Sequence, residues 1–157
     1  MLTWHRSYCP PPPHRDADEL LRRTVQWWKE WSSRGRIAAD WREPVRRSLI
    51  TLKALTDRRT GGMVAAATTS LPERLGGVRN WDYRFCWVRD AAFALYALMT
   101  SGYWDEARAW REWLRRAVAG DLAELQVMYG LAGERRLDEQ ELPWLAGLAG
   151  RRPVRAG

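Results

Sequence analysis

The apolar residues in the first third of the chain recur at the spacing of an amphipathic helix. One face of that helix collects Leu20, Leu21, Val25, Trp28 and Trp31. Asp16 or Asp18 stands just before the periodic stretch, where a carboxylate can accept hydrogen bonds from the first free backbone N–H groups. The pattern therefore predicts a helix that ends where Ser32, Ser33 and Gly35 interrupt the periodicity.

A second amphipathic helix is predicted directly after residue 40. Its apolar positions follow one another at steps of four, four and three: Trp41, Val45, Leu49 and Leu52. Asp40 and Glu43 have the spacing of a capping box, and Pro44 is tolerated in a first helical turn. The segment 60–77 then holds small residues with glycine and proline, which predicts a loop or a short hairpin and not a helix.

The pattern changes in the middle of the chain. Aromatic residues occupy every second position from 81 to 87, and the pair Arg89–Asp90 then precedes the run AAFALYALM. That run is apolar on all sides, so we expect a helix over about 89–100 that other elements enclose. The stretch 104–119 again has a single apolar face, made of Trp104, Ala107, Trp110, Leu114 and Ala117. An enclosed helix followed by a one-faced helix is typical of a double ring, in which outer helices wrap inner ones.

Composition limits the possible partners. A chain of 157 residues with 46% hydrophobic content can build one domain with a core. Its eleven tryptophans must enter that core or face a flat ligand. The net charge of +7 would suit nucleic acid, but only two of the 26 basic residues are lysines, and the arginines are interleaved with acids along the whole chain. Neither a basic stripe nor a nucleic-acid motif is present, which disfavours a nucleic-acid partner.

Cysteine and histidine usage points to a reducing environment. Cys9 and Cys86 define neither a disulfide framework nor a metal site, and only two histidines accompany them. We therefore expect free thiols, a cytoplasmic protein, no metal and no cofactor. The N-terminus lacks the apolar segment of a signal peptide, and no run of about 18 apolar residues occurs, so no membrane helix is expected.

Arg89 and Asp90 have two readings on residue types alone. Asp90 can be a first-turn acid that favours the helix N-terminus, with Arg89 as its surface partner. Alternatively, both project into a pocket at the start of the helix and hold polyhydroxylated groups by charge-assisted hydrogen bonds. In that case Tyr83 and Trp87 would supply flat apolar faces for the C–H faces of sugar rings.

The motif itself favours the second reading through a resemblance. The segment MVAAATTSLPERLGGVRNWDYRFCWVRDAAFALYALMTSGY resembles the signature segment of glycoside hydrolase family 15, the glucoamylase and trehalase family of prokaryotic type. Flanking blocks resemble the same family in the same order: LTWHRSYCPPPP, WREPVRRSLITLKALT, LQVMYGLAGERRLDEQEL and RRPVRAG. The resemblance covers essentially the whole chain, and the block RNWDYRFCWVRD is long and specific.

The resemblance implies a β-sandwich domain, a linker helix and an (α/α)6 barrel, in that order. We therefore expect an all-α chain that forms part of such a barrel and has lost the N-terminal β-sandwich. Residues 1–13 would be the remnant final strand of the sandwich, over 1–8, followed by a proline linker. Residues 14–39 would be the linker helix, and 40–157 the N-terminal part of the barrel.

The resemblance also assigns a sugar subsite. Arg89 and Asp90 would hold the hydroxyls of a glucosyl unit in the innermost subsite, and Tyr83 and Trp87 would line it. Arg152, in an Arg-Pro block, would contribute from another substrate-facing loop. The expected partner is an α-linked glucoside of the maltooligosaccharide or trehalose class.

The implied reaction is the inverting hydrolysis of an α-glucosidic bond, in which one glutamate protonates the leaving oxygen and another activates water. In the family, both glutamates lie beyond the block that matches RRPVR, so we expect them downstream of Gly157. No catalytic residue is then assigned within this chain, and we expect it to be inactive alone. A reading from another class stays open: a non-catalytic carbohydrate-binding or helical interaction module, in which the apolar helix recruits a partner chain.

Overall fold

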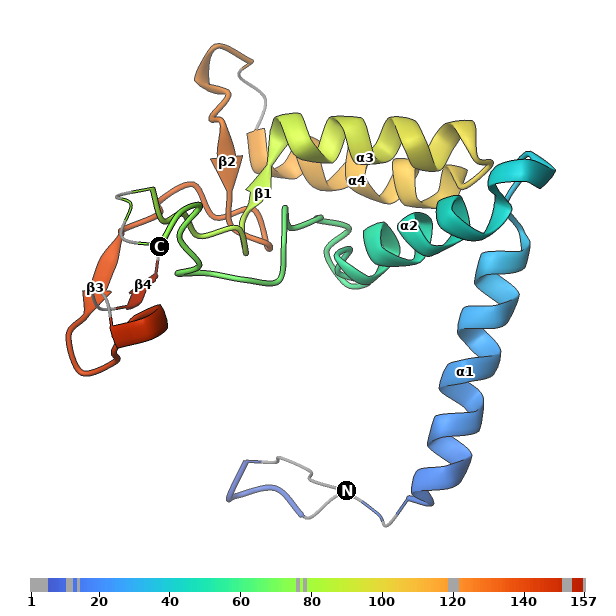
Figure 1. Cartoon of the computed structure of the whole chain (residues 1–157), viewed down its shortest axis with the longest axis horizontal. Helices are drawn as coiled ribbons and strands as arrows, with labels where there is room; N and C mark the ends of the chain where they lie inside the picture. Colours follow the sequence, from blue (N-terminus) through green and yellow to red (C-terminus); the bar gives the residue numbers. More distant parts are fainter. Residues whose placement is uncertain are drawn as a thin grey trace. The chain divides into compact units, whose positions relative to one another are not determined.

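The described residues of the chain, 6–10, 13, 15–75, 77, 79–118, 122–150 and 154–156, contain four α-helices and two two-stranded sheets in a computed structural model (Figure 1). The chain divides into two units, residues 1–35 and residues 36–157. The expected helical character is therefore confirmed. Closure of the helices into an (α/α)6 barrel, loss of a β-sandwich and the domain boundaries at 13 and 39 stay predictions.

The first unit contains one long helix, α1 (Ala17–Ser33). Asp16 is its N-cap, and the Asp16 carboxylate accepts a hydrogen bond of 2.9 Å from the backbone N–H of Asp18. Trp28 makes an edge contact with Trp31, which is buried, with ring centroids 6.1 Å apart. The predicted helix and its acidic cap are thus confirmed, although part of the predicted apolar face is exposed: Leu21 and Val25.

The N-terminal segment shows a turn where a strand was predicted. Residues 1–5 lie outside the described residues. The backbone N–H of Cys9 donates to the carbonyl of Arg6 at 2.9 Å, which closes a turn through Tyr8. Because this hydrogen bond satisfies the backbone locally, the predicted strand over 1–8 does not extend through Tyr8.

The second unit begins with a short 3-10 turn, Ala39–Trp41, that runs into α2 (Arg42–Ala54). The predicted capping box is wrong. Asp40 lies inside the 3-10 turn, and the N-cap position of α2 is Trp41, which makes no side-chain capping hydrogen bond. Glu43 instead pairs with Arg46 one turn further on, with Oε1 and Nη1 3.0 Å apart.

Two antiparallel helices follow the aromatic segment. They are α3 (Val88–Thr100) and α4 (Trp104–Val118), and they lie side by side in Figure 1. Gly102, with a φ of +89°, makes the tight link between them, a conformation that favours glycine. The helices predicted over about 89–100 and 104–119 are therefore confirmed, the second through Val118, since residue 119 lies outside the described residues.

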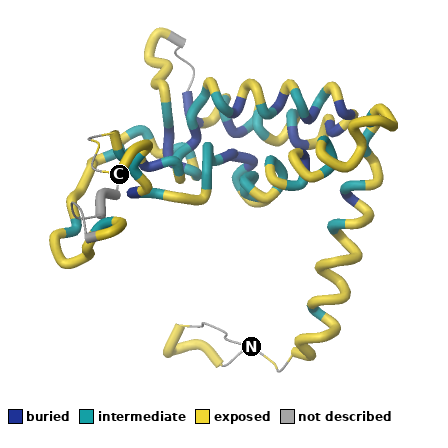
Figure 2. The backbone as a smooth tube through the Cα atoms, in the orientation of Figure 1, coloured by how far each residue is buried: buried dark blue, intermediate teal, exposed yellow. Residues whose placement is uncertain are grey.

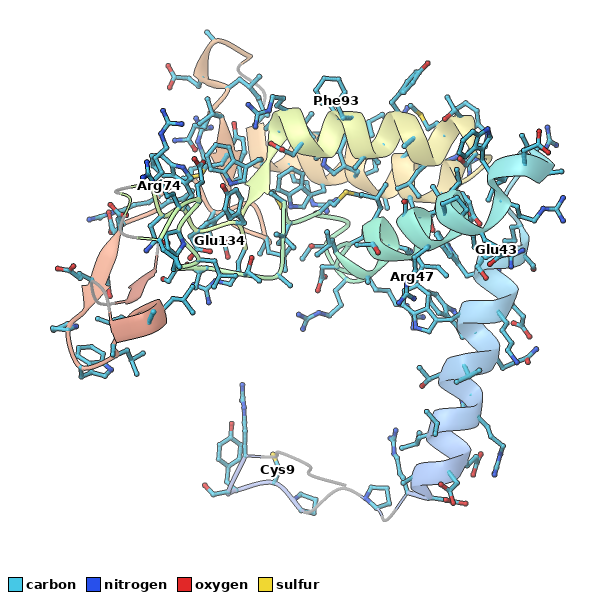
Figure 3. The ribbon with its side chains drawn as sticks, viewed as in Figure 1. Cys9, Glu43, Arg47, Arg74, Phe93 and Glu134 are labelled. Atoms are coloured by element: carbon cyan, nitrogen blue, oxygen red, sulfur yellow. The ribbon has the colours of Figure 1, made fainter. Side chains whose placement is uncertain are left out.

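The expectation that α3 is enclosed on all sides is not met. Its contacts with α2, α4 and β1 (Cys86–Trp87) bury one side, which includes Leu95 and Leu98. Phe93, labelled in Figure 3, is 71% exposed on the other side, and Tyr96 is 66% exposed. Figure 2 shows exposed positions along α3. No described element covers that face, so α3 is an apolar helix with a one-sided core contact.

The core of the second unit forms where α4 meets a two-stranded sheet. The strand β1 pairs antiparallel with β2 (Met128–Tyr129), so that Cys86 lies opposite Tyr129. Trp113 of α4 packs edge-on against the Tyr129 ring, and its Nε1 donates to the carbonyl of Leu131 at 3.0 Å. The buried cluster consists of Cys86, Trp113, Ala117, Val118 and Tyr129.

The second sheet lies near the C-terminal end of the chain. It pairs β3 (Gln140–Leu142) antiparallel with β4 (Val154–Ala156). No periodic pattern predicted these two short strands, which pair across the loop between them.

The loop between α2 and β1 is folded tightly against α4. Asp57 accepts hydrogen bonds of 2.8 Å from the backbone N–H groups of Arg59 and Thr60. The hydrogen bond from Thr60, aided by Arg59, lowers the pKa of the Asp57 carboxyl. Gly61 has a φ of +82°, and a Cβ there would lie 2.5 Å from the carbonyl oxygen of Ala109. This segment of the predicted loop therefore requires glycine at its closest approach to α4.

An ion pair joins α2 to α4. The Nζ of Lys53 lies 3.0 Å from Oε1 of Glu106, and the two side chains are only 19% and 7% exposed. Glu106 thus occupies the buried side of α4, whereas Trp104, which the pattern assigned to that side, is 56% exposed. Removing one member of such a pair leaves the other charge poorly solvated.

We predict that Glu106→Ala lowers the free energy of unfolding by about 2–3 kcal/mol, because Lys53 loses its partner in a mostly buried position. Urea denaturation followed by tryptophan fluorescence measures the change. Asp105→Ala is the matched control, since Asp105 and its partner Arg108 are 77% and 72% exposed and an exposed pair contributes less than about 1 kcal/mol. Equal effects of the two variants would contradict the role given to the Lys53–Glu106 pair.

Candidate functional site

Arg89 and Asp90 form an ion pair in the first turn of α3. The Arg89 Nη2 lies 3.2 Å from the Asp90 Oδ2. The side chains are 75% and 41% exposed, so both keep hydrogen-bonding capacity toward solvent. The N-cap of the helix is Trp87, without a side-chain capping bond, so Asp90 is a first-turn acid that interacts favourably with the positive end of the helix.

Trp87 and Arg89 share a hollow at one end of the β1–β2 pair. The hollow has a volume of about 480 Å³, and the segment Leu125–Val127 forms its other wall. The Nε1 of Trp87 is buried and has no hydrogen-bond partner among the described residues. One aromatic face and one guanidinium therefore meet at the same hollow, which we call the Trp87–Arg89 hollow.

The other predicted site residues lie elsewhere. Asp90 lines a separate groove of about 380 Å³ between α2 and α3, together with Leu52 and Phe93. Tyr83 is half-buried in the loop before β1, where its backbone N–H donates to the carbonyl of Thr68 at 3.2 Å. Arg152 lies outside the described residues. The structure thus joins Arg89 to both Trp87 and Asp90, but it does not gather all the predicted residues around one hollow.

A charged pair in the same motif was not assigned a role from the sequence. Asp82, whose side chain is only 2% exposed, accepts from the Arg84 Nε at 3.0 Å and Nη2 at 2.7 Å. It also accepts from the Arg84 backbone N–H at 3.0 Å. The hydrogen bond to Asp82 raises the pKa of the Arg84 guanidinium. The Asp-x-Arg spacing in WDYR was the available signal, since an aspartate readily accepts from the residue two positions on.

Arg84 reaches a second hollow, at the other end of the β1–β2 pair. This hollow has a volume of about 430 Å³, and we call it the Arg84–Glu134 hollow. Its walls come from the residues before β1 and after β2: Arg84, Phe85, Gly130, Glu134, Arg136 and Asp138. Both ends of one short ladder therefore open onto a hollow with an aromatic side chain and an arginine.

Cys86 lies between these hollows, and its thiol is shielded from solvent. It is fully buried, and burial, aided by the negative charges of Glu134 and Asp57, raises the pKa of its thiol to about 12. A thiol that stays protonated in water-excluded surroundings is not a nucleophile at neutral pH. Among the described residues, no group of three or more His, Cys, Asp or Glu side chains is arranged to hold a metal ion. None of the described helices is long and apolar enough to cross a membrane.

Comparison with known proteins identifies the family. The sequence profile described as "Glycosyl hydrolases family 15" matches residues 40–157. The chain is 42% identical over 160 residues to the trehalase of Mycobacterium tuberculosis, an alignment that covers 99% of this chain and 23% of that protein. It is 39% identical to the trehalase of Thermoplasma volcanium, over 87% of this chain and 22% of the relative. Trehalase 1 of Sulfolobus acidocaldarius is 38% identical, over 90% of this chain and 25% of the relative.

The chain belongs to glycosyl hydrolase family 15, as the resemblance indicated. It spans about a quarter of the length of the curated trehalases that it matches. No solved structure matches the chain at a significant level.

We predict that Cys86 resists alkylation by iodoacetamide at about pH 8, because its thiol is buried and its pKa is raised to about 12. Cys9 is exposed and provides the internal control. Intact mass after labelling should show one adduct in native buffer and two in urea. Rapid addition of two adducts under native conditions would contradict the buried position of Cys86.

Proposed function

We propose that this chain contributes the glucosyl-binding part of an inverting α-glucoside hydrolase whose substrate is trehalose. The observation that carries the proposal is the similarity to curated trehalases over 87–99% of the chain. The solvent-open Arg89–Asp90 pair beside Trp87 supports it, because a sugar could reach these groups. Glucoamylase-type maltooligosaccharides are the second substrate class that the family admits.

The chemistry of the two side chains suits a glucosyl unit. Sugar hydroxyls both donate and accept, so Arg89 can donate to one hydroxyl while Asp90 accepts from a neighbouring one. The ion pair of 3.2 Å holds the guanidinium and carboxylate next to each other before a ligand arrives. Such preorganisation reduces the entropy lost on binding. The ring of Trp87 supplies an apolar surface for the C–H face of the same sugar.

The hydrolytic step needs two carboxylates, one as general acid and one as general base. Among the described residues, no carboxylate lines the Trp87–Arg89 hollow, and the Asp90 carboxylate beside it is taken up in the ion pair with Arg89. We therefore propose that the acid and base glutamates belong to parts of the protein outside this chain, and that Arg89, Asp90 and Trp87 position the sugar for them. On this proposal the chain alone binds part of the substrate and does not cleave it.

We predict that Asp90→Asn in the intact protein that carries this chain lowers kcat/KM for trehalose, because a charge-assisted hydrogen bond to the sugar is lost. The expected loss of transition-state stabilisation is about 2–4 kcal/mol. Arg89→Met should act in the same direction. Glucose release from trehalose and from maltose measures both the effect and the substrate preference.

The matched control is Asp105→Asn, because Asp105 is the exposed first-turn acid of α4 and should leave turnover unchanged. If the Asp90 and Asp105 variants both retained normal turnover, Asp90 would be only a helix-end acid. If the intact wild-type protein bound sugars without releasing glucose, a carbohydrate-binding module would replace the hydrolase.

A further inference from the structure

The wall Leu125–Val127 of the Trp87–Arg89 hollow has no role in the function proposed above. We infer that Arg135 is the positioning residue of this wall and that the wall presents the side-chain amide of Gln126 to the sugar. The inference rests on the proposed function, because it takes the hollow as the site of a glucosyl unit. It adds one sugar contact and the residue that holds this contact in place.

Gln126 provides the polar side chain of the wall. It is exposed and lines the hollow between Leu125 and Val127. Its backbone N–H donates to the Tyr129 hydroxyl at 2.9 Å, whereas its side-chain amide has no hydrogen-bond partner in the described part of the chain. An amide both donates and accepts, as a sugar hydroxyl does. Gln126 therefore offers a neutral contact on the wall opposite the Arg89 guanidinium.

Arg135 joins the end of α4 to the residue before the wall. Its Nη1 donates to the carbonyl of Val118, the last residue of α4, at 3.3 Å. Its Nη2 donates at 2.9 Å to the carbonyl of Glu124, which directly precedes Leu125. A cation at a helix C-terminus bonds a carbonyl that has no partner within the helix and interacts favourably with the helix dipole. The guanidinium thus fixes the point at which the chain enters the wall.

A tight turn after β2 brings Arg135 to the end of α4. The backbone N–H of Gly130 donates to the carbonyl of Glu134 at 2.8 Å, and the N–H of Gly133 donates to the carbonyl of Gly130 at 2.9 Å. The turn packs against α4, since a Cβ at Gly133 would lie 3.5 Å from the Cα of Ala117. Arg135 directly follows this turn, so its guanidinium is directed by the backbone before any ligand binds.

Two further hydrogen bonds hold the other end of the wall. The Tyr129 hydroxyl, which accepts from Gln126, belongs to a fully buried ring of the core. The backbone N–H of Val88 donates to the carbonyl of Val127 at 3.1 Å. Without Arg135 the wall would stay attached at this end and would be released at the end that begins at Leu125. The Gln126 amide would then lose its defined position, and ordering it again on binding would cost affinity.

The test measures the steady-state kinetics of trehalose hydrolysis by the intact protein. We expect Arg135→Met to raise KM about three- to tenfold, the loss of one neutral hydrogen bond to substrate. Because the ground state and the transition state lose this bond equally, kcat should change less than about twofold. Gln126→Leu should raise KM by a similar factor. The double variant should exceed the larger single effect by less than about twofold, because Arg135 acts through the wall that carries Gln126.

Arg116→Met is the matched control. Arg116 also donates from its Nη2 to a backbone carbonyl, that of Thr60 at 2.7 Å, in the loop before β1 and not at the hollow. The variant loses the same kind of hydrogen bond and should leave KM unchanged.

An unchanged KM in either Arg135→Met or Gln126→Leu would overturn the inference. A residue that only stabilises the fold lowers the amount of active enzyme, and hence the apparent kcat, without raising KM. Fully multiplicative KM effects in the double variant would overturn it as well, because Arg135 would then act independently of Gln126. A wild-type protein that does not hydrolyse trehalose would instead contradict the proposed function, and the inference would fall with it.

Discussion

The antiparallel pairing of β1 with β2 is the constraint on which the candidate site depends. It places Cys86 opposite Tyr129, and both enter the core beside Trp113 of α4. Because this core excludes water, the residues on either side of Cys86 have fixed positions: Trp87 and Arg89 on one side, Arg84 and Phe85 on the other. The chain continues from β1 directly into α3, so the core also determines the position of the first turn of α3. A ladder only two residues long thus orients both hollows.

The helices could be predicted from the sequence, and the reason is local. In α1, α2 and α4 the apolar residues recur every three or four positions, α3 is recognisable as a continuous apolar run, and α1 also begins at an acidic cap, Asp16. The pairings between distant segments could not be predicted in this way. Strands of two or three residues have no measurable periodicity, and the Lys53–Glu106 pair joins two helices whose relative placement no local pattern reveals. The position of Asp40 could not be predicted from the local pattern either, because Asp40 lies inside the 3-10 turn before α2 and is therefore not the N-cap residue.

The motif predicted the chemistry of the site better than its geometry. The block RNWDYRFCWVRD contains the residues that line both hollows on the β1 side, yet residue types alone left Arg89 and Asp90 open to a purely structural role. No role was assigned to the Asp82–Arg84 pair, because its importance depends on the burial of the Asp82 side chain, which no local pattern reveals. The exposed side of α3, with Phe93 and Tyr96, likewise contradicts the fully apolar pattern taken by itself. Tertiary contacts, and not periodicity, decided each of these points.

A structure of the intact protein with glucose bound would show directly whether the Arg89–Asp90 pair and Trp87 hold the sugar. We expect one glucose in the Trp87–Arg89 hollow, with hydroxyl oxygens within hydrogen-bond distance of the Arg89 guanidinium and of the Asp90 carboxylate paired with it, and with the sugar's C–H face against Trp87. Glucose bound elsewhere, with Arg89 and Asp90 paired only to each other and facing water, would contradict it.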